Sequence, residues 1–518
     1  GFGVKGSASE RWLLFAVTLF AAALRLPTLA GKSMWVDEGL TALCAESFAF
    51  AFEQCWTVGV NTPATIFMTV LPYGWWPDEF GLRLIPALFG IAAVPAIYGL
   101  VRQWSNRAGA TSAALFLAGS PLHLHHSQDA RTYSVMIFCS IVSMLLLGRL
   151  YEQWQKESAR AVLLVTAALY VFVTLLSLYN HYHAVLLLGA QILWVGAMLL
   201  RSKTRSRRKA ALCSSLLYLS VVIGFAPWFP PVMKLAGEKW VRASVTQTPV
   251  DAVEGRALTG GPESRFAPGE VIGETLQRLV SKWTQGEVPP PGDRRWVWFF
   301  QLGLAVVGAY AIAKTDKPRA LLLGLVFTTA LAYVVVAAAP LLLYSRIYLY
   351  VRHVAFAFPI FIAFQGTAVG FFWQRSRVLG AVALAVYLCT VGPALEFYYR
   401  VNKQDWRGAS EFLMANAAHG DQVVVDCADW AMLAYLQRNG FQLSYDRVRS
   451  FEVYRGEKTL TFINPVVPYD PAKPLWWVHA ESSSAPAEIL DPGRLQYRSE
   501  WGYLGGSIEI YSHGPSLP

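Results

Sequence analysis

Apolar blocks long enough to cross a bilayer recur along most of this chain, and no other feature limits its fold as strongly. A spanning helix needs about 20 predominantly apolar residues. The candidate segments are residues 11–30, 82–101, 109–124, 132–150, 161–179, 184–200, 211–229, 296–313, 319–339, 351–373 and 378–396. The sequence therefore predicts a mostly α-helical, polytopic membrane protein with about eleven transmembrane helices. The first block has no clear cleavage site, so we expect a retained helix and not a signal peptide.

Charged residues divide the chain into two parts. Only 15% of the 518 residues are charged, whereas a soluble chain carries about 25%. We therefore predict a transmembrane domain at 1–396, made mostly of apolar blocks, and a soluble domain at 397–518, whose composition is ordinary. The basic residues behind the net charge of +10 cluster between apolar blocks, where they face anionic lipid. Nucleic acid is therefore not an expected partner.

The placement of lysine and arginine predicts which loops face the cytoplasm. If the N-terminus is inside, the short inner loops carry Arg102, Arg107, Arg149, Lys156, Arg160, Arg201, Lys203, Arg205, Arg207, Arg208, Lys209, Lys314, Lys317, Arg319, Arg375 and Arg377. The short outer loops and helix mouths carry only Lys32, Arg83, Arg131, Arg346 and Arg352. Basic residues are enriched on the cytoplasmic side of membrane proteins. Because the number of crossings is odd, we expect the soluble domain outside.

Five outer segments follow from this orientation, at residues 31–81, 125–133, 179–184, 230–295 and 340–352. The first contains an apolar run from Pro63 to Trp76 that is too short to cross the membrane, so we expect interfacial helix there. Cys44 and Cys55 share this segment and could pair in an oxidising compartment, whereas a helical segment would hold them too far apart for a disulfide.

The soluble domain has the pattern of a small α/β domain. Asp405 is a candidate cap for a helix that runs to about residue 418, and a second helix is expected at 430–438. A buried strand is expected at 422–426, with further strands at 475–478, 495–501 and 507–511. The domain has no glycine motif for phosphate, and its simplest interpretation is a lid or scaffold.

Polar residues gather in the outer segments. Asp37 and Glu38 directly follow the first crossing, where they either begin a helix or carry acid–base chemistry. Gln128, Asp129 and Arg131, in the second outer segment, follow His123, His125 and His126. His181 and Tyr182 lie in the third, and Arg352 and His353 begin a late crossing. An arginine there either snorkels to lipid headgroups or binds a phosphate with two parallel hydrogen bonds.

The histidines raise the question of a metal. Their spacing matches no strong ligand motif, so His126 and His181 are only weak candidates for binding a divalent ion. No other cofactor is indicated.

Several motifs together resemble the GT-C superfamily of membrane glycosyltransferases. Trp35-Val36-Asp37-Glu38-Gly39 resembles the acid motif of the first outer loop in that superfamily. The other motifs are Leu82–Gly90, Ser127–Tyr133, His181-Tyr182, Pro227-Trp228, Arg352-His353 and Asp405–Gly408. They resemble a bacterial family related to protein O-mannosyltransferases and lipid A aminoarabinose transferases. One segment departs from the pattern, because Asn61-Thr62-Pro63-Ala64 stands where relatives often show a His-Pro-Pro-Leu-like string.

The resemblance implies an inverting glycosyltransferase of a bacterial inner membrane, with its active site and soluble domain on the periplasmic side. It would move a sugar from a polyprenyl-phosphate donor to a hydroxyl of a glycan, lipid or protein acceptor. Asp37 would be the general base, with Glu38 in support. The residues that would bind the donor phosphate are Arg352, Arg131 and His353. The residues that would line the cavity or contact the acceptor are Asp129, Gln128, His181, Tyr182 and Asn61.

The alternative is a transporter or flippase for polyprenyl-linked or other amphiphilic lipids. It would also need outward polar residues and a groove wide enough for a lipid. The one-sided placement of the charged residues and the lack of an evident inverted repeat in the sequence favour the enzyme.

Overall fold

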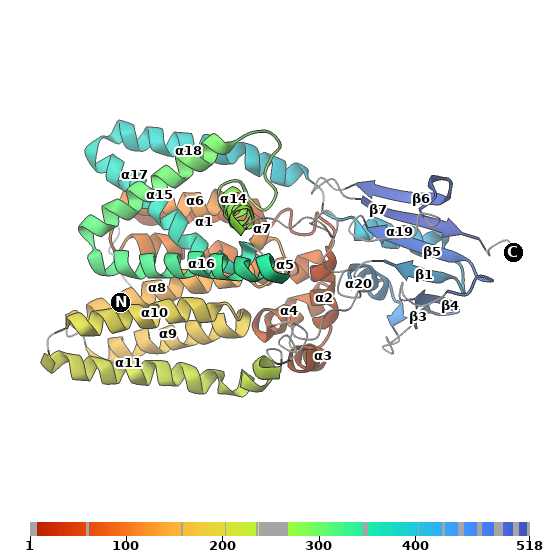
Figure 1. Ribbon diagram of the computed structural model, residues 1–518, viewed down its shortest axis with the longest axis horizontal. Helices are drawn as coiled ribbons and strands as arrows, with labels where there is room; N and C mark the ends of the chain where they lie inside the picture. Colours follow the sequence, from red (N-terminus) through yellow and green to blue (C-terminus); the bar gives the residue numbers. More distant parts are fainter. Residues whose placement is uncertain are drawn as a thin grey trace.

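The computed structural model of the protein describes residues 8–514 except 59–61, 157–158, 203, 235–236, 238–267, 345–350, 402, 427–429, 444–449, 464–468, 481–489 and 501–506. Asn61, Arg346 and much of the predicted outer segment 230–295 therefore lie outside the described residues. Figure 1 shows a bundle of long helices joined end-on to a domain built on a sheet.

In the described part of the chain, nine helices are long and apolar enough to cross a membrane. They coincide or overlap with α5 (Glu79–Val101), α8 (Tyr133–Gln155), α9 (Arg160–Asn180), α10 (Ala184–Arg201), α11 (Thr204–Phe225), α15 (Arg295–Thr315), α16 (Lys317–Tyr344), α17 (Phe358–Arg375) and α18 (Arg377–Arg400). All nine match predicted crossings. The predicted class, a mostly helical polytopic membrane protein with a terminal α/β domain, is confirmed.

The other two predicted crossings are also helical but are not among these nine. α1 (Ala8–Arg25) carries charges near both ends and packs against α5 and α6 (Arg107–Gly119). α6 has only 13 residues because the chain bends at Ser120, whose side chain accepts a hydrogen bond from the backbone N–H of His123. Pro121 then begins the short helix α7 (Pro121–Ser127). The break turns the end of one predicted crossing into a separate, largely buried helix that carries three histidines.

The first outer segment is helical. It contains α2 (Val36–Cys44), α3 (Phe48–Glu53), a π-helical turn η1 (Gln54–Val58) and α4 (Pro63–Trp75), the last at the position of the predicted interfacial helix. These helices lie at the end of the bundle that faces the soluble domain (Figure 1). Cys44 and Cys55 are both free thiols, buried in one apolar cluster with Trp228.

The soluble domain is a mixed seven-stranded sheet in the order β2-β3-β4-β1-β5-β7-β6. Its elements are α19 (Trp406–Asn416), β1 (Gln422–Val425), α20 (Trp430–Arg438), β2 (Gln442–Leu443), β3 (Ser450–Arg455), β4 (Lys458–Ile463), β5 (Leu475–Ala480), β6 (Leu495–Glu500) and β7 (Ser507–His513). The two helices and the strands β1, β5, β6 and β7 match the sequence predictions. The antiparallel hairpin of β3 and β4, which turns at Gly456 with φ +60°, was not predicted.

The soluble domain is docked directly on the first outer segment. α20 packs on α2, and a Cβ atom added to Gly39 would lie 2.3 Å from the Cα of Ala431. Only glycine allows the two helices to approach so closely. The hydroxyl of Tyr435 accepts a hydrogen bond from the backbone N–H of Met34 at 2.7 Å. The helix that carries the two predicted acids is therefore held between the bundle and the sheet domain.

Candidate functional site

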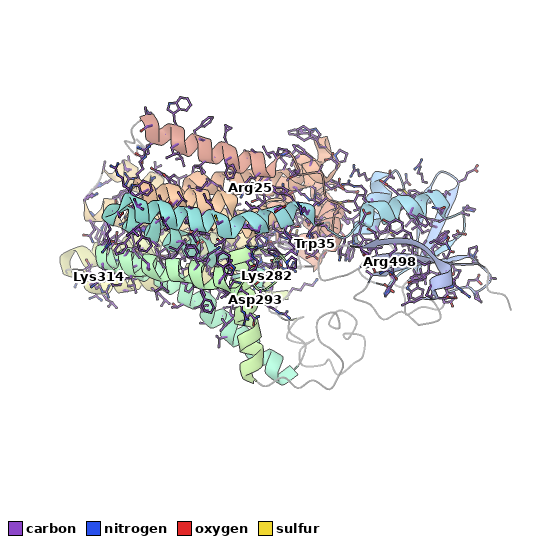
Figure 2. All side chains as sticks on the ribbon, turned by 90° about the horizontal axis from the view of Figure 1, so that it is seen from above. Arg25, Trp35, Lys282, Asp293, Lys314 and Arg498 are labelled. Atoms are coloured by element: carbon purple, nitrogen blue, oxygen red, sulfur yellow. The ribbon has the colours of Figure 1, made fainter. Side chains whose placement is uncertain are left out.

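The loops predicted to share a side of the membrane lie together. At one end of the bundle, Arg319 contacts Gln103 and Glu152, which joins three predicted inner segments. At the other end, residues of the predicted outer segments meet beside the soluble domain. Figure 2 shows Trp35 at this junction and Lys314 at the opposite end of the bundle. The polar residues singled out from the sequence are therefore concentrated at the junction.

Asp37 lies in the first turn of α2 between two arginines. Its Oδ2 atom is 3.8 Å from Nη2 of Arg131 and 3.7 Å from Nη2 of Arg352. These separations are within ion-pair range but longer than a hydrogen bond. The side chain is 32% exposed, so a substrate can reach it. The N-cap of α2 is Trp35, so Asp37 is not the capping residue.

Glu38, by contrast, is completely buried and fully engaged. Its two oxygens accept hydrogen bonds from Nε and Nη2 of Arg83, each at 2.7 Å, and from the backbone N–H groups of Ala130 and Trp35. The ammonium of Lys403 lies 3.4 Å away. Burial alone would raise the pKa of Glu38, but Arg83 and Lys403 outweigh burial and hold that pKa well below its usual range. The carboxylate links α2, α5 and the second outer loop.

Arg352 and Arg131 come from distant segments and converge on the same carboxylate. The guanidinium of Arg352 lies 5.5 Å from the ring centre of Trp35 and 5.7 Å from that of Tyr133, which is the geometry of cation–π contacts. Arg131 reaches the backbone carbonyl of Asp37 at 3.4 Å. Two cations predicted to bind phosphate therefore lie beside the same carboxylate, and aromatic rings fix one of them, Arg352.

The third outer loop contributes a cluster of histidines. The rings of His353 and His183 stack with their centres 4.6 Å apart, and the ring of His181 lies 5.0 Å from that of His183. Burial lowers the pKa of His181 well below its usual value, so this ring is neutral at pH 7. Tyr182 does not join the cluster, because it packs in the apolar cluster around Trp228.

The second outer loop braces the site. Asp129 is buried, and its Oδ1 atom accepts a hydrogen bond from Nε1 of Trp35 at 2.7 Å. Burial raises the pKa of Asp129 to about 6, and Lys403, 3.9 Å away, opposes that rise. Gln128 donates to the backbone carbonyl of Arg25 and accepts from the hydroxyl of Tyr398. Its amide therefore ties α1 to α18 and does not face Asp37.

One group of side chains could form a metal site. The potential ligand atoms of His125, His126 and Asp129 lie within 4.8 Å of one another, whereas His181 is in the other histidine cluster. Burial lowers the pKa of His126 to about 4, and a neutral imidazole suits a divalent ion. However, Asp129 already pairs with Lys403 and with the indole of Trp35. The group therefore fits a divalent ion poorly.

Sequence reasoning missed three residues of this site. Arg83 was counted only as an outer cation, although it holds both oxygens of Glu38. His183 lies in the third outer segment but was given no role, and Lys403 was not among the predicted site residues. The one signal for Lys403 is its position next to the Asp405–Gly408 motif. Its partners Glu38 and Asp129 are hundreds of residues earlier in the chain, so only the fold brings the three together.

Comparison with known proteins identifies the fold. No protein-family model matches this chain, and no curated protein is similar to it in sequence. In structure, ArnT from Cupriavidus metallidurans superposes with a TM-score of 0.56 at 13% identity, covering 99% of this chain and 100% of ArnT. The same protein bound to undecaprenyl phosphate gives a TM-score of 0.55 at 12% identity, with the same coverage.

A second similar structure is the archaeal oligosaccharyltransferase AglB from Archaeoglobus fulgidus, in complex with an inhibitory peptide and a dolichol-phosphate. It gives a TM-score of 0.53 at 13% identity, and the match covers 82% of this chain but only 63% of AglB. This chain thus spans less than two thirds of the archaeal protein. ArnT and AglB both belong to the GT-C superfamily. The resemblance seen in the sequence motifs is therefore confirmed at the level of the fold, which this chain shares with ArnT and AglB.

Proposed function

We propose that the protein transfers a sugar from a polyprenyl-phosphate donor to a hydroxyl of its acceptor, with inversion at the anomeric carbon. The observation that carries this proposal is the position of Asp37, an accessible carboxylate held between the guanidinium groups of Arg131 and Arg352. A base beside two cations is what such a transfer requires. Structures of the same fold have been solved with undecaprenyl phosphate and with dolichol-phosphate, which supports a lipid phosphate as the donor.

The chemistry follows from the charges. Asp37 takes the proton of the acceptor hydroxyl as its oxygen bonds to the anomeric carbon. The bond from that carbon to the phosphate oxygen breaks on the opposite face, which inverts the configuration and releases polyprenyl phosphate. Negative charge grows on the leaving phosphate, where Arg352 and Arg131 stabilise it. A phosphate that binds both guanidiniums also competes with Asp37 for them, so donor binding releases the carboxylate to accept a proton.

The other residues have supporting roles in this proposal. Glu38 anchors α2 through Arg83, and Gln128 fixes the second outer loop. His353 and His181 border the phosphate site, and burial, which lowers the pKa of His181, keeps that ring neutral. Asp129 holds the indole of Trp35, and Tyr182 shapes the apolar wall near the interfacial helix.

The test is to incubate the purified protein with a polyprenyl-phosphate sugar labelled in the sugar and to measure free polyprenyl phosphate. We expect the carrier to be released only when an acceptor is present, and the product to have the inverted configuration. Movement of intact labelled lipid across a vesicle membrane, without release of the carrier, would contradict the enzyme and support the flippase.

The proposal also places the site on the periplasmic side of a bacterial inner membrane. Asp293 is 61% exposed in a predicted outer segment, and Lys156 is 75% exposed in a predicted inner loop. We expect Asp293→Cys to react in intact cells with a thiol reagent that cannot cross the membrane, and Lys156→Cys to react only after lysis. Labelling of the unsubstituted protein is the baseline. The reverse pattern would invert the orientation and move the site to the cytoplasm.

A further inference from the structure

Lys403 belongs to the segment that leads into the soluble domain, yet its side chain lies among the acids of the membrane domain. Its ammonium is 3.4 Å from Oε2 of Glu38 and 3.9 Å from Oδ1 of Asp129, and the side chain is only 12% exposed. Glu38 already has Arg83 as a bidentate partner. For Asp129, the ammonium of Lys403 is the partner that offsets its burial most.

Asp129 is in turn connected to the reacting groups through Trp35. Its Oδ1 atom accepts the indole N–H of Trp35 at 2.7 Å, and Trp35 is the N-cap residue of α2. Asp37 follows two residues later, and the guanidinium of Arg352 lies over the Trp35 ring at 5.5 Å. One continuous set of contacts therefore runs from Lys403 through Asp129 and Trp35. It ends at Asp37, the proposed base, and at Arg352, the proposed phosphate ligand.

The docked domain holds Lys403 in this place. Arg407, four residues later, pairs with Glu79 at 2.7 Å, and Arg438 on α20 pairs with the other oxygen of Glu79 at 2.8 Å. The backbone N–H of Arg407 also donates to the hydroxyl of Ser33 at 3.1 Å. The contacts of the soluble domain thus attach the segment around Lys403 to the first outer segment. That outer segment also contains Glu38, which Lys403 contacts.

We propose that Lys403 is a positioning residue of the transferase site. It keeps Asp129 ionised and thereby holds Trp35, Asp37 and Arg352 in their relative positions. The soluble domain then contributes directly to the site, because it supplies the ammonium group of Lys403. The inference rests on the proposed function for its effect on transfer, but the ionisation of Asp129 can be measured without any substrate.

The direction of the effect follows from the charges around Asp129. A cation within about 4–6 Å favours the ionised carboxylate and lowers its pKa by about 1–3 units. Removing Lys403 leaves burial and the charge of Glu38, which both favour the protonated acid, opposed mainly by Arg131 and the indole hydrogen bond. The groups that face Asp129 or its neighbours are Trp35, Glu38, Arg131, Tyr133, Tyr398, His125, His126, Lys403 and, through the histidines, Glu287, Lys282, Arg352 and Lys32.

The experiment compares Lys403→Met, which keeps most of the stem without the charge, with Lys403→Arg, which keeps the charge. The control is Lys458→Met, because Lys458 is in the same domain but donates only to the backbone carbonyl of Met414 in the described structure. The acidic limb of kcat/KM against pH should move upward by about one pH unit in Lys403→Met. We expect it to stay near its original place in Lys403→Arg and Lys458→Met. A uniform loss of activity with an unmoved limb would reduce Lys403 to a packing residue and overturn the proposal.

Infrared difference spectra between acid and neutral pH provide the measurement that needs no donor. The carbonyl band of protonated Asp129, identified by its loss in Asp129→Asn, should titrate at higher pH in Lys403→Met than in the unsubstituted protein. An unshifted titration overturns the role of Lys403. If the band shifts and no sugar is transferred from any polyprenyl-phosphate donor, the proposed function fails and the link between Lys403 and Asp129 stands.

A double-mutant cycle tests the connection through Trp35. Trp35→Phe keeps a ring beneath Arg352 but removes the indole N–H that Asp129 accepts. If Lys403 acts through this hydrogen bond, the losses of transfer in Lys403→Met and Trp35→Phe will not multiply in the double variant. Fully multiplicative losses would show that Lys403 acts by another route, which contradicts the proposal.

Discussion

Asp37→Asn is expected to lower the rate of sugar transfer on the order of 10²-fold or more, while the protein folds normally. Asparagine has the size of aspartate but cannot take the proton of the acceptor. The side chain of Asp37 is 32% exposed, and its two ion pairs are 3.7 and 3.8 Å long. Ion pairs of this kind contribute little to stability. The measurements are the release of polyprenyl phosphate at saturating donor and the midpoint of thermal unfolding.

Glu38→Gln is the matched control, because it makes the same chemical change at the next residue. Glu38 is fully buried and bound by Arg83 through both oxygens. Breaking a buried ion pair by removing one partner costs about 3–5 kcal/mol, so we expect this variant to unfold at a clearly lower temperature. The two neighbours thus separate catalysis from stability. Full transfer activity in Asp37→Asn would remove Asp37 from the base role, and Asp129 would be the next candidate.

The contrast between these two acids shows what a sequence can and cannot reveal. The pair was recognisable because two adjacent carboxylates follow a spanning block, and the spanning blocks are visible from length and composition alone. Which acid is buried depends on Arg83, 45 residues later, whose guanidinium reaches Glu38 from α5. Hydrophobic pattern does not encode that contact.

The fold was predictable because spanning blocks are visible from length and composition alone. The differences between the predicted and the observed elements have local causes. Long apolar blocks predicted eleven crossings, and nine of them match spanning helices in the described part of the chain. The block at 109–124 differs because it contains Ser120-Pro121, which ends α6 and begins α7. In the soluble domain, β1 and β5 were visible as apolar runs. β3 and β4 were missed because their apolar residues alternate with polar ones across a tight turn at Gly456. Lys403 was missed because its partners, Glu38 and Asp129, lie in the transmembrane domain, far from it in the sequence.

Arg352→Gln should impair use of the donor far more than an ordinary outer arginine would. A charge-assisted contact to a phosphate whose charge grows in the transition state is worth roughly 2–4 kcal/mol. The expected loss in kcat/KM for the donor is therefore roughly 30- to 1,000-fold. Arg352 is only 19% exposed, and its guanidinium is placed by Trp35 and Tyr133 next to Asp37. An arginine that merely reached for lipid headgroups would not need such a setting.

Arg295→Gln provides the comparison, because Arg295 also begins a spanning helix at the outer side. Its side chain is 66% exposed and pairs with Asp293 at 2.6 Å, away from the aromatic rings of the site. We expect little change in transfer for this variant. Arg352→Lys should recover only part of the activity, since an ammonium keeps the charge but lacks the two parallel hydrogen bonds of a guanidinium. Equal and small losses of transfer in Arg352→Gln and Arg295→Gln would mean that Arg352 does not bind the phosphate. Arg131 would then have to stabilise the leaving phosphate alone.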